Sequence, residues 1–219
     1  MYEKGYAHKP LKEIVKEICL YSDGATLSAA KDFLVNGGGF LAFNDELLYR
    51  QALDIVALYG LRLLEPLRTI LTYSIPEILE NDFYIHQRVA QVHYLWSRLK
   101  EINIPLIHPA GGHAVFIDVK NFLPHISSDK FPVKSLLSFL YLISGIRGAE
   151  HLLLNPKSGM NYELLRLAIP IGKHSKEHMD DIVEAFNLIA KNIHKVKGMR
   201  KIKQPGGIVG SLQAHFKIL

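Results

Sequence analysis

The periodicity of apolar residues is the sequence feature that most restricts how this chain can fold. Apolar side chains recur at intervals of three and four residues over 45–74 and again over 76–99. Residues at those intervals share one face of a helix, so the pattern predicts two long helices, with Pro66 as the point where the first would bend. The same spacing over 9–20 predicts a shorter helix that ends before the Ser-Asp-Gly break at 22–24.

Short stretches of strand-forming residues lie on both sides of these helices. Thr26–Ser28, Phe33–Val35 and Phe40–Phe43 surround the triple glycine 37–39, which predicts strand, glycine turn and strand. After Asn103 the chain becomes rich in β-forming residues, and this change predicts a second domain. The elements expected there are strands over 113–119, 146–154 and 164–169, a turn at 155–159, and helices over 132–144 and from Ser175 to about 194. Strands that alternate with helices indicate an α/β or α+β layer fold.

The composition supports a globular protein without a membrane-spanning segment. Hydrophobic residues make up 48% of the 219 residues, enough for a sizeable core. The longest apolar stretch, 136–143, is much shorter than the roughly 18 residues that a spanning helix needs. Cys19 is the only cysteine, which excludes an internal disulfide, and no secretory signal is recognisable. We therefore expect a cytoplasmic protein.

The net charge of +5 favours anionic partners but does not select among phosphate, carboxylate, RNA and membrane surfaces. The densest basic run spans 191–203 and contains no aromatic side chain on which a base could stack. We expect this run to be a solvated helix end, and we expect neither a nucleic-acid nor a membrane partner.

Lys31 is a candidate catalytic lysine. A lysine that forms a Schiff base needs a fixed position and space beside it for a flat ring. Alanines at 29 and 30 leave such space. Ser28 offers a hydroxyl to a phosphate, and the glycines 37–39 allow a close approach of the backbone. Taken alone, the pattern also fits an ordinary surface lysine and a serine that caps a helix.

Several motifs together resemble one enzyme family. The stretch SAAKDFLVNGGGF at 28–40 is similar to the cofactor-lysine segment of the pyridoxal-phosphate-dependent β-eliminating lyases, the family of tryptophanase and tyrosine phenol-lyase. Five further motifs follow in the family's order and at similar spacings: AGGHA at 110–114, HISSDKFP at 125–132, GIRGAE at 145–150, LLRLAIP at 164–170 and HMD at 178–180. The resemblance covers most of residues 9–199.

The resemblance implies an α/β fold, namely the C-terminal part of a fold-type-I pyridoxal-phosphate enzyme. Residues 1–103 would be a remnant of the large cofactor domain with its linking helices, and residues 104–219 would be a small α+β domain. The chain departs from the family at 59–64, where the family is much richer in glycine.

The resemblance also assigns roles around Lys31. Lys31 would form the Schiff base with pyridoxal 5'-phosphate, and Ser28 would contact the cofactor phosphate. The backbone carbonyl of Asn36 would help to bind a monovalent cation, potassium. Ala30 stands where the family has a lysine, so one charge close to the phosphate is missing.

Arg166 and His151 are the candidate substrate-binding residues. Arg166 lies within the apolar run 164–169, where its guanidinium must meet an anion or reach solvent. Considered alone, a structural salt bridge is the favoured interpretation, whereas the resemblance implies that Arg166 binds the substrate α-carboxylate. His151 lies on a strand that helps to sort substrates in the family, where tyrosine phenol-lyase has arginine and tryptophanase is apolar. His151 matches neither pattern, so the sequence does not determine which substrate side chain is preferred.

Three other histidines are weaker candidates. His113 follows two glycines at the start of an expected strand, and a buried, hydrogen-bonded histidine is the favoured interpretation. His174 and His178 are four residues apart on an expected helix face, a spacing that can bind a metal, but no third ligand is evident.

The resemblance implies that the chain alone is incomplete for catalysis. In the family, the acid beside the pyridine nitrogen, the aromatic stacked on the ring and the phosphate loop lie in the N-terminal half, which has no counterpart here. We expect a lyase that eliminates the aromatic side chain of tyrosine or tryptophan and leaves pyruvate and ammonium. A separate N-terminal half chain, a homo-oligomer or both would complete it. Two alternatives are a non-catalytic fragment or interaction subunit with an exposed apolar surface, and an anion-binding or nucleic-acid-binding module that uses the basic run.

Overall fold

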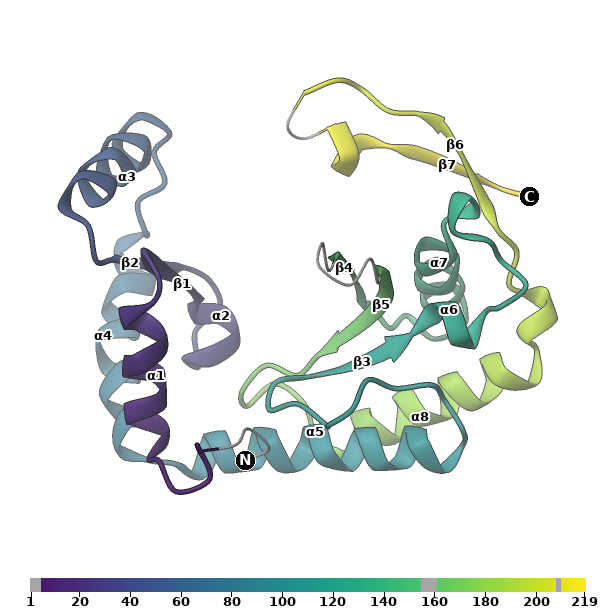
Figure 1. Ribbon diagram of the computed structural model, residues 1–219, viewed down its shortest axis with the longest axis horizontal. Helices are drawn as coiled ribbons and strands as arrows, with labels where there is room; N and C mark the ends of the chain where they lie inside the picture. The colour runs from purple at the N-terminus through teal and green to yellow at the C-terminus, as the bar shows by residue number, and fades with distance from the viewer. Residues whose placement is uncertain (1–4, 155–160, 208–209) are drawn as a thin grey trace. The chain divides into compact units, whose positions relative to one another are not determined.

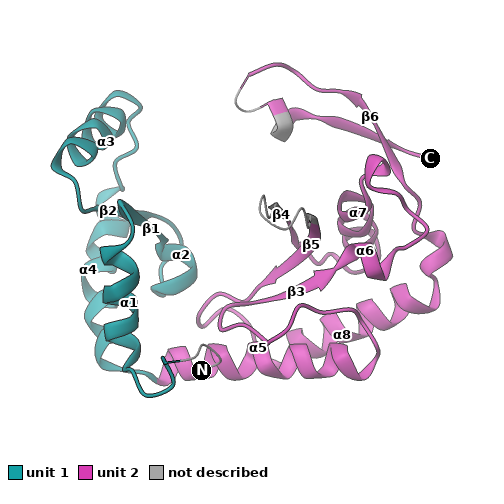
Figure 2. Ribbon diagram, in the orientation of Figure 1, with its two compact units in different colours: residues 1–82 teal, residues 83–219 magenta. Residues whose placement is uncertain are grey.

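The computed structural model describes residues 5–154, 161–207 and 210–219, and Figure 1 shows their helices and strands. The chain forms two compact units, unit 1 (Met1–Asp82) and unit 2 (Phe83–Leu219), which Figure 2 colours separately. Each unit is described by itself below. The boundary between these units follows Asp82, and the predicted division into two domains after residue 103 stays a prediction.

Unit 1 contains a two-stranded antiparallel ribbon. β1 (Gly24–Ser28) pairs with β2 (Gly39–Phe43), with Ser28 opposite Gly39. The one-turn helix α2 (Ala29–Asp32) follows β1 directly. The longer helices of the unit are α1 (Leu11–Leu20), α3 (Glu46–Leu58) and α4 (Glu65–Glu80).

The helix boundaries in unit 1 differ from the expected ones. The single helix predicted over 45–74 is wrong, because α3 and α4 are separated by residues 59–64. Gly60 lies just beyond the end of α3 with a φ of +62°, the left-handed conformation that commonly ends a helix. The predicted bend at Pro66 is wrong because Pro66 lies in the first turn of α4, where proline is tolerated. Pro76 lies inside α4, so the expected break before it is absent.

The strand predicted at Phe33–Val35 is also wrong. Phe33 and Val35 are both buried, and the ring of Phe33 lies 5.7 Å from that of Phe40. Two positions this far apart could share one face of a strand, but α2 ends at Asp32 and the residues after it form a series of bends instead of an extended strand. The positive φ of Leu34, +40°, turns the chain between the two buried residues, so the segment anchors the ribbon instead of extending it.

Unit 2 contains a three-stranded antiparallel sheet in the order β3-β5-β4. Its strands are β3 (Ala114–Asp118), β4 (Ala149–Leu154) and β5 (Asn161–Ala168). Its helices are α5 (Phe83–Glu101), α6 (Val119–Phe122), α7 (Pro132–Ser144) and α8 (Lys176–Lys191), with short 3-10 turns at η1 (Ser128–Lys130), η2 (Ile193–Lys195) and η3 (Gly210–Gln213). A separate ribbon pairs β6 (Met199–Lys203) with β7 (His215–Ile218).

The expected elements of unit 2 are largely confirmed. The helix over 132–144 has the predicted bounds. Ser175 is the N-cap residue of α8, as predicted, and its backbone N–H donates to Nδ1 of His178 at 3.0 Å. The basic run 191–203 is not a helix end, because α8 stops at Lys191 and the run continues through η2 and β6. The turn predicted at 155–159 lies outside the described residues. Both units together make the chain a mixed α/β protein, as predicted.

The two faces of the unit 2 sheet have different surroundings. One face packs into the core formed with α5, α7 and α8, and it carries Val115, Ile117, Leu165 and Leu167. Side chains alternate along a strand, so Phe116 and Arg166 point to the opposite face. Among the described helices of unit 2, none lies over that second face (Figure 1).

Unit 1 exposes much more apolar surface than unit 2. Helices α1 and α3 contain no buried residue. Most of the exposed large hydrophobic side chains belong to this unit, among them Leu11, Ile18, Leu47, Leu58, Leu61 and Leu64. Among the described helices, none is long and apolar enough to cross a membrane.

Candidate active site

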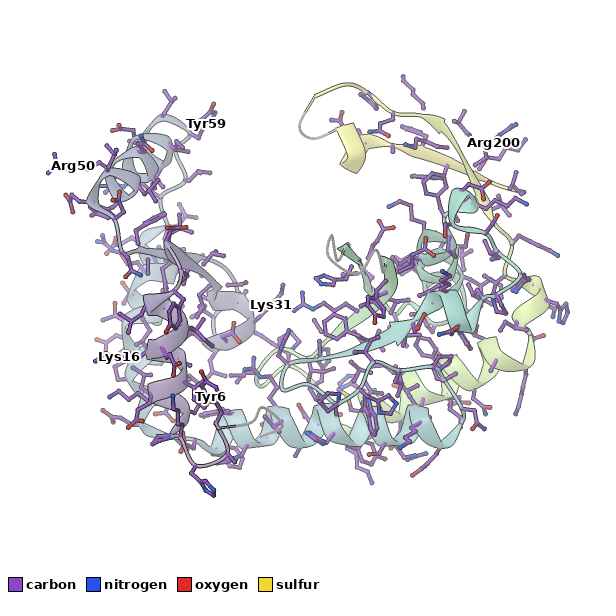
Figure 3. The ribbon with its side chains drawn as sticks, viewed as in Figure 1. Tyr6, Lys16, Lys31, Arg50, Tyr59 and Arg200 are labelled. Atoms are coloured by element: carbon purple, nitrogen blue, oxygen red, sulfur yellow. The ribbon has the colours of Figure 1, made fainter. Side chains whose placement is uncertain are left out.

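Lys31 lies on the one-turn helix α2 at the end of the β1–β2 ribbon (Figure 3). Ser28 is the N-cap residue of this turn, and the backbone N–H of Ala29 donates to the carbonyl oxygen of Gly38 at 3.0 Å. Ala29 is fully buried and Lys31 is exposed. The backbone at the start of the turn that carries Lys31 is therefore held to the glycine segment by this hydrogen bond.

The glycines opposite the turn are required by the geometry. Gly38 has a φ of +85°, which L side chains rarely adopt, and a Cβ at Gly39 would overlap the carbonyl oxygen of Leu27. Two alanines precede Lys31, and Gly39, which has no side chain, lies opposite Ser28 in the ribbon. The residues just before Lys31 are therefore small, as a site for a flat cofactor would require. The side chain of Asn36 is exposed just before the glycines.

Arg166 occupies the central strand of the unit 2 sheet. In the antiparallel register it lies between Phe116 of β3 and Ala149 of β4, and the small alanine leaves space on one side. The guanidinium Nε is buried and has no hydrogen-bond partner among the described residues. A buried donor without a partner is costly, so an anion that reaches this face would be held strongly.

His151 lies on the same face of the sheet, two residues along β4 from Ala149. Its ring is half-buried and lies 5.5 Å from the ring of Phe116, with the two planes tilted by 59°. One sheet face therefore places a guanidinium, an aromatic ring and an imidazole side by side. Such a face can bind the carboxylate and the aromatic ring of one molecule.

The predicted site residues fall into two groups. Ser28, Lys31 and Asn36 lie together around the turn of unit 1, and Arg166 and His151 lie together on the sheet face of unit 2. The members of each group therefore belong to a single unit.

The other histidines have different surroundings from those expected. His113 is exposed, so the prediction of a buried histidine is wrong, and its ring lies 6.4 Å from that of Phe116. The rings of His174 and His178 lie 5.8 Å apart. The described part of the chain contains no cluster of three metal-ligating side chains.

Sequence reasoning missed Phe116 as a member of the site. Phe116 looks like one of several apolar residues in a β-rich stretch, and only the strand register places it beside Arg166 and His151. Val115, Phe116 and Ile117 are all apolar, so no polar–apolar alternation in the sequence distinguishes the one that faces away from the core.

Comparisons with known proteins identify the group to which these features belong. The sequence model of the β-eliminating lyase family matches residues 6–194. The chain is 39% identical to the tyrosine phenol-lyase of Symbiobacterium thermophilum, over 93% of this chain and 47% of that protein. It is 38% identical to the tyrosine phenol-lyase of Nostoc punctiforme, over 99% and 49%, and 36% identical to the tryptophanase of Salinibacter ruber, over 93% and 45%.

The chain thus spans about half the length of the curated relatives that it matches. The family match includes both the Lys31 turn and the Arg166 strand. On this basis, the chain belongs to the β-eliminating lyase family.

Proposed function

We propose that this chain supplies the C-terminal half of a pyridoxal-phosphate-dependent lyase that eliminates the side chain of an aromatic amino acid, giving pyruvate and ammonium. The observation that carries the proposal is the Lys31 turn, in which alanines and glycines surround an exposed lysine. The names of the relatives support this reaction class. We also propose a fold-type-I arrangement, with 1–103 in the cofactor domain and 104–219 in the small domain.

The residues of the turn would hold the cofactor and move one proton. Nζ of Lys31 would hold the cofactor and, once the substrate amine replaces it, accept the α-proton of the substrate. The hydroxyl of Ser28 would donate a hydrogen bond to the phosphate. The backbone carbonyl of Asn36 would help to bind potassium. When bound, pyridoxal phosphate supplies the electron sink that stabilises the substrate carbanion.

The sheet face of unit 2 would position the substrate. The guanidinium of Arg166 would bind the α-carboxylate, since its buried Nε lacks a partner and a carboxylate can accept two charge-assisted hydrogen bonds from an arginine. His151 would contact the aromatic leaving group, because its ring lies beside Phe116 and an imidazole can both donate and accept a hydrogen bond.

The apolar surface of unit 1 supports a protein partner. A groove of about 720 Å³ lies between the ribbon, α3 and the segment 61–65, and Phe40, Leu41 and Leu53 contribute to its walls. These three side chains are 40–53% exposed. Large exposed apolar patches mark interaction sites, and the relatives are about twice as long as this chain. We therefore propose that an N-terminal half covers this surface, as a separate chain or within a homo-oligomer.

Complementation tests the proposed activity. The chain is mixed with the N-terminal half of the Symbiobacterium thermophilum tyrosine phenol-lyase, pyridoxal phosphate and either tyrosine or tryptophan. We expect pyruvate from at least one substrate. Borohydride reduction followed by peptide mass spectrometry should place the cofactor on Lys31.

Two substitutions make this test specific. Lys31→Arg keeps the positive charge but should lose both the label and the pyruvate, because a guanidinium does not form the covalent bond. Lys16→Arg, on an exposed position of α1, should retain both. A stable complex whose label lies on another lysine, or that carries no label, contradicts the proposal.

The second candidate function is a non-catalytic interaction subunit, and the exposed faces of α1 and α3 favour it. In that case the chain forms a complex with the N-terminal half, detected by light scattering, without label or pyruvate. Lys31→Arg would then leave every measured property of the complex unchanged.

A further inference from the structure

The helix-covered side of unit 2 contains a groove that the proposed function does not use. It has a volume of about 720 Å³ and lies between the end of α7, the end of β5 and α8. All of its walls belong to unit 2. Small-molecule sites typically have volumes of about 300–1,000 Å³, so the groove is large enough for a small organic ligand.

The lining of the groove contains an apolar surface. Leu167, Ile169 and Ile182 are buried side chains of its floor, and Ile143 and Leu188 are exposed at its rim, by 36% and 49%. An apolar group of a ligand would remove the rim side chains from water, which is favourable in proportion to the area covered.

Charged side chains of both signs line the same groove. Arg147 comes from the connection between α7 and β4, whereas Asp181 and Glu184 come from α8. None of these three side chains forms a hydrogen bond or an ion pair with another described residue. The opposite charges therefore share one groove without neutralising each other directly. A ligand that carries both charges could bridge them.

His174 adds a neutral polar group to the groove. Burial and, secondarily, the neighbouring His178 lower the pKa of His174 below its ordinary value of 6.5, which favours the uncharged imidazole at neutral pH. A neutral imidazole has one donor and one acceptor nitrogen. His174 therefore provides hydrogen bonds without adding a charge to those of Arg147, Asp181 and Glu184.

We propose that this groove binds a free amino acid with an apolar side chain. Its carboxylate would pair with Arg147, its ammonium with Asp181 and Glu184, and its side chain would cover the apolar floor. Leu167 lines the groove and lies with Leu165 on the core face of the sheet, whereas Arg166 lies on the opposite face. The groove is therefore separate from the proposed substrate site. The inference does not depend on the proposed function.

Titration of the full chain with three probes tests the inference. The probes are L-phenylalanine, phenethylamine, which lacks the carboxylate, and 3-phenylpropionate, which lacks the ammonium. The measurement is the shift of the methyl NMR signals of Ile182 and Leu188, which line the groove. We expect L-phenylalanine to shift both signals and to bind at least about tenfold more tightly than either single-charge probe, a difference of about 1.4 kcal/mol.

Substitutions locate the binding and separate it from the substrate site. Arg147→Gln should weaken L-phenylalanine binding to the level of phenethylamine, and Glu184→Gln should weaken it toward that of 3-phenylpropionate. Arg166→Gln and Lys120→Gln, the latter at an exposed position of α6, should leave it unchanged.

Three results would overturn the inference: no shift of the groove signals up to the solubility of L-phenylalanine, equal affinity for all three probes, or loss of binding in Arg166→Gln. If Arg147→Gln does not fold, the comparison of the probes on the unsubstituted chain decides the question.

Discussion

The surroundings of Arg166 distinguish a binding role from a stabilising one. A buried structural ion pair that loses one partner typically costs roughly 3–5 kcal/mol, whereas the Nε of Arg166 has no hydrogen-bond partner among the described residues. We therefore expect Arg166→Met to change the free energy of unfolding of the isolated chain by less than about 1 kcal/mol, measured by urea denaturation. A methionine retains most of the apolar stem.

Arg98 provides the contrast for this prediction. Its Nη1 donates to the hydroxyl of Tyr94 and to the carboxylate of Asp180, at 2.7 and 3.0 Å. Arg98→Met removes these interactions, so it should destabilise the chain more than Arg166→Met. A larger loss at Arg166 would favour a structural salt bridge over the proposed carboxylate site.

His174 predicts a dependence of stability on pH. Burial and His178 lower its folded-state pKa below the ordinary value of 6.5, so the unfolded chain binds the proton more tightly than the folded chain. The contribution to stability is complete above pH 6.5 and is lost as the pH falls through the folded-state pKa. We expect the melting temperature to decrease over this range, and His174→Gln to make the decrease smaller. His194→Gln, at an exposed position, is the control, and equal pH profiles for all three proteins would contradict the assignment.

The β1–β2 ribbon depends on a glycine at the element scale. A Cβ at Gly39 would overlap the carbonyl oxygen of Leu27 on the neighbouring strand. Gly39→Ala should therefore separate the strands and destabilise unit 1 by about 2–3 kcal/mol, near the upper end of the usual range for point substitutions. Gly206→Ala is the matched control, because a Cβ there meets nothing within 4 Å. Thermal unfolding followed by circular dichroism compares the two, and equal stabilities would show that the ribbon tolerates a side chain.

Elements with their own start and stop signals could be predicted from the sequence. α7 begins at Pro132 and ends before Gly145, whose φ is +72°, and α8 begins after the capping residue Ser175. The end of α3 was missed because the apolar periodicity continues through residues 59–64, although the backbone turns at Gly60. Periodicity reports which face of a helix is apolar, but it does not report where tertiary packing interrupts the helix.

The candidate site was predictable to the extent that it depends on local sequence. Lys31 and Arg166 belong to continuous motifs, so their neighbours in the chain identify them. The contact of Phe116 with His151 and the groove shared by Arg147 and Glu184 join segments that are distant in sequence. Such contacts depend on strand register and helix packing, which a single sequence does not specify.

The two units differ in how completely they bury their apolar residues. The main hydrophobic core cluster lies wholly within unit 2, from Val92 to Val196. Among the described residues of unit 1, the buried apolar side chains are few: Ala29, Phe33, Val35, Leu71 and Ile78. Since apolar burial is the principal stabilising contribution to folding, unit 1 should be the less stable unit in the isolated chain.

Hydrogen exchange measured on the full chain tests this difference. Backbone amides open with free energies that follow local packing, so amides of α1 and α3 should exchange faster than those of α5 and α8. Addition of the N-terminal half of a tyrosine phenol-lyase should slow exchange in α3, because that helix forms a wall of the apolar groove of unit 1.

One substitution connects this protection to the groove. Leu53→Asp places a charge on the groove wall at a side chain that is 46% exposed, so it should leave the isolated chain folded while weakening the protection of α3 by the partner. Leu188→Asp, at a similarly exposed position in unit 2, should leave that protection intact. Two results would contradict the proposal that an N-terminal half covers the apolar surface of unit 1. One is equal protection of both units from exchange in the isolated chain. The other is that the partner slows exchange in α3 of Leu53→Asp as much as in the unsubstituted chain.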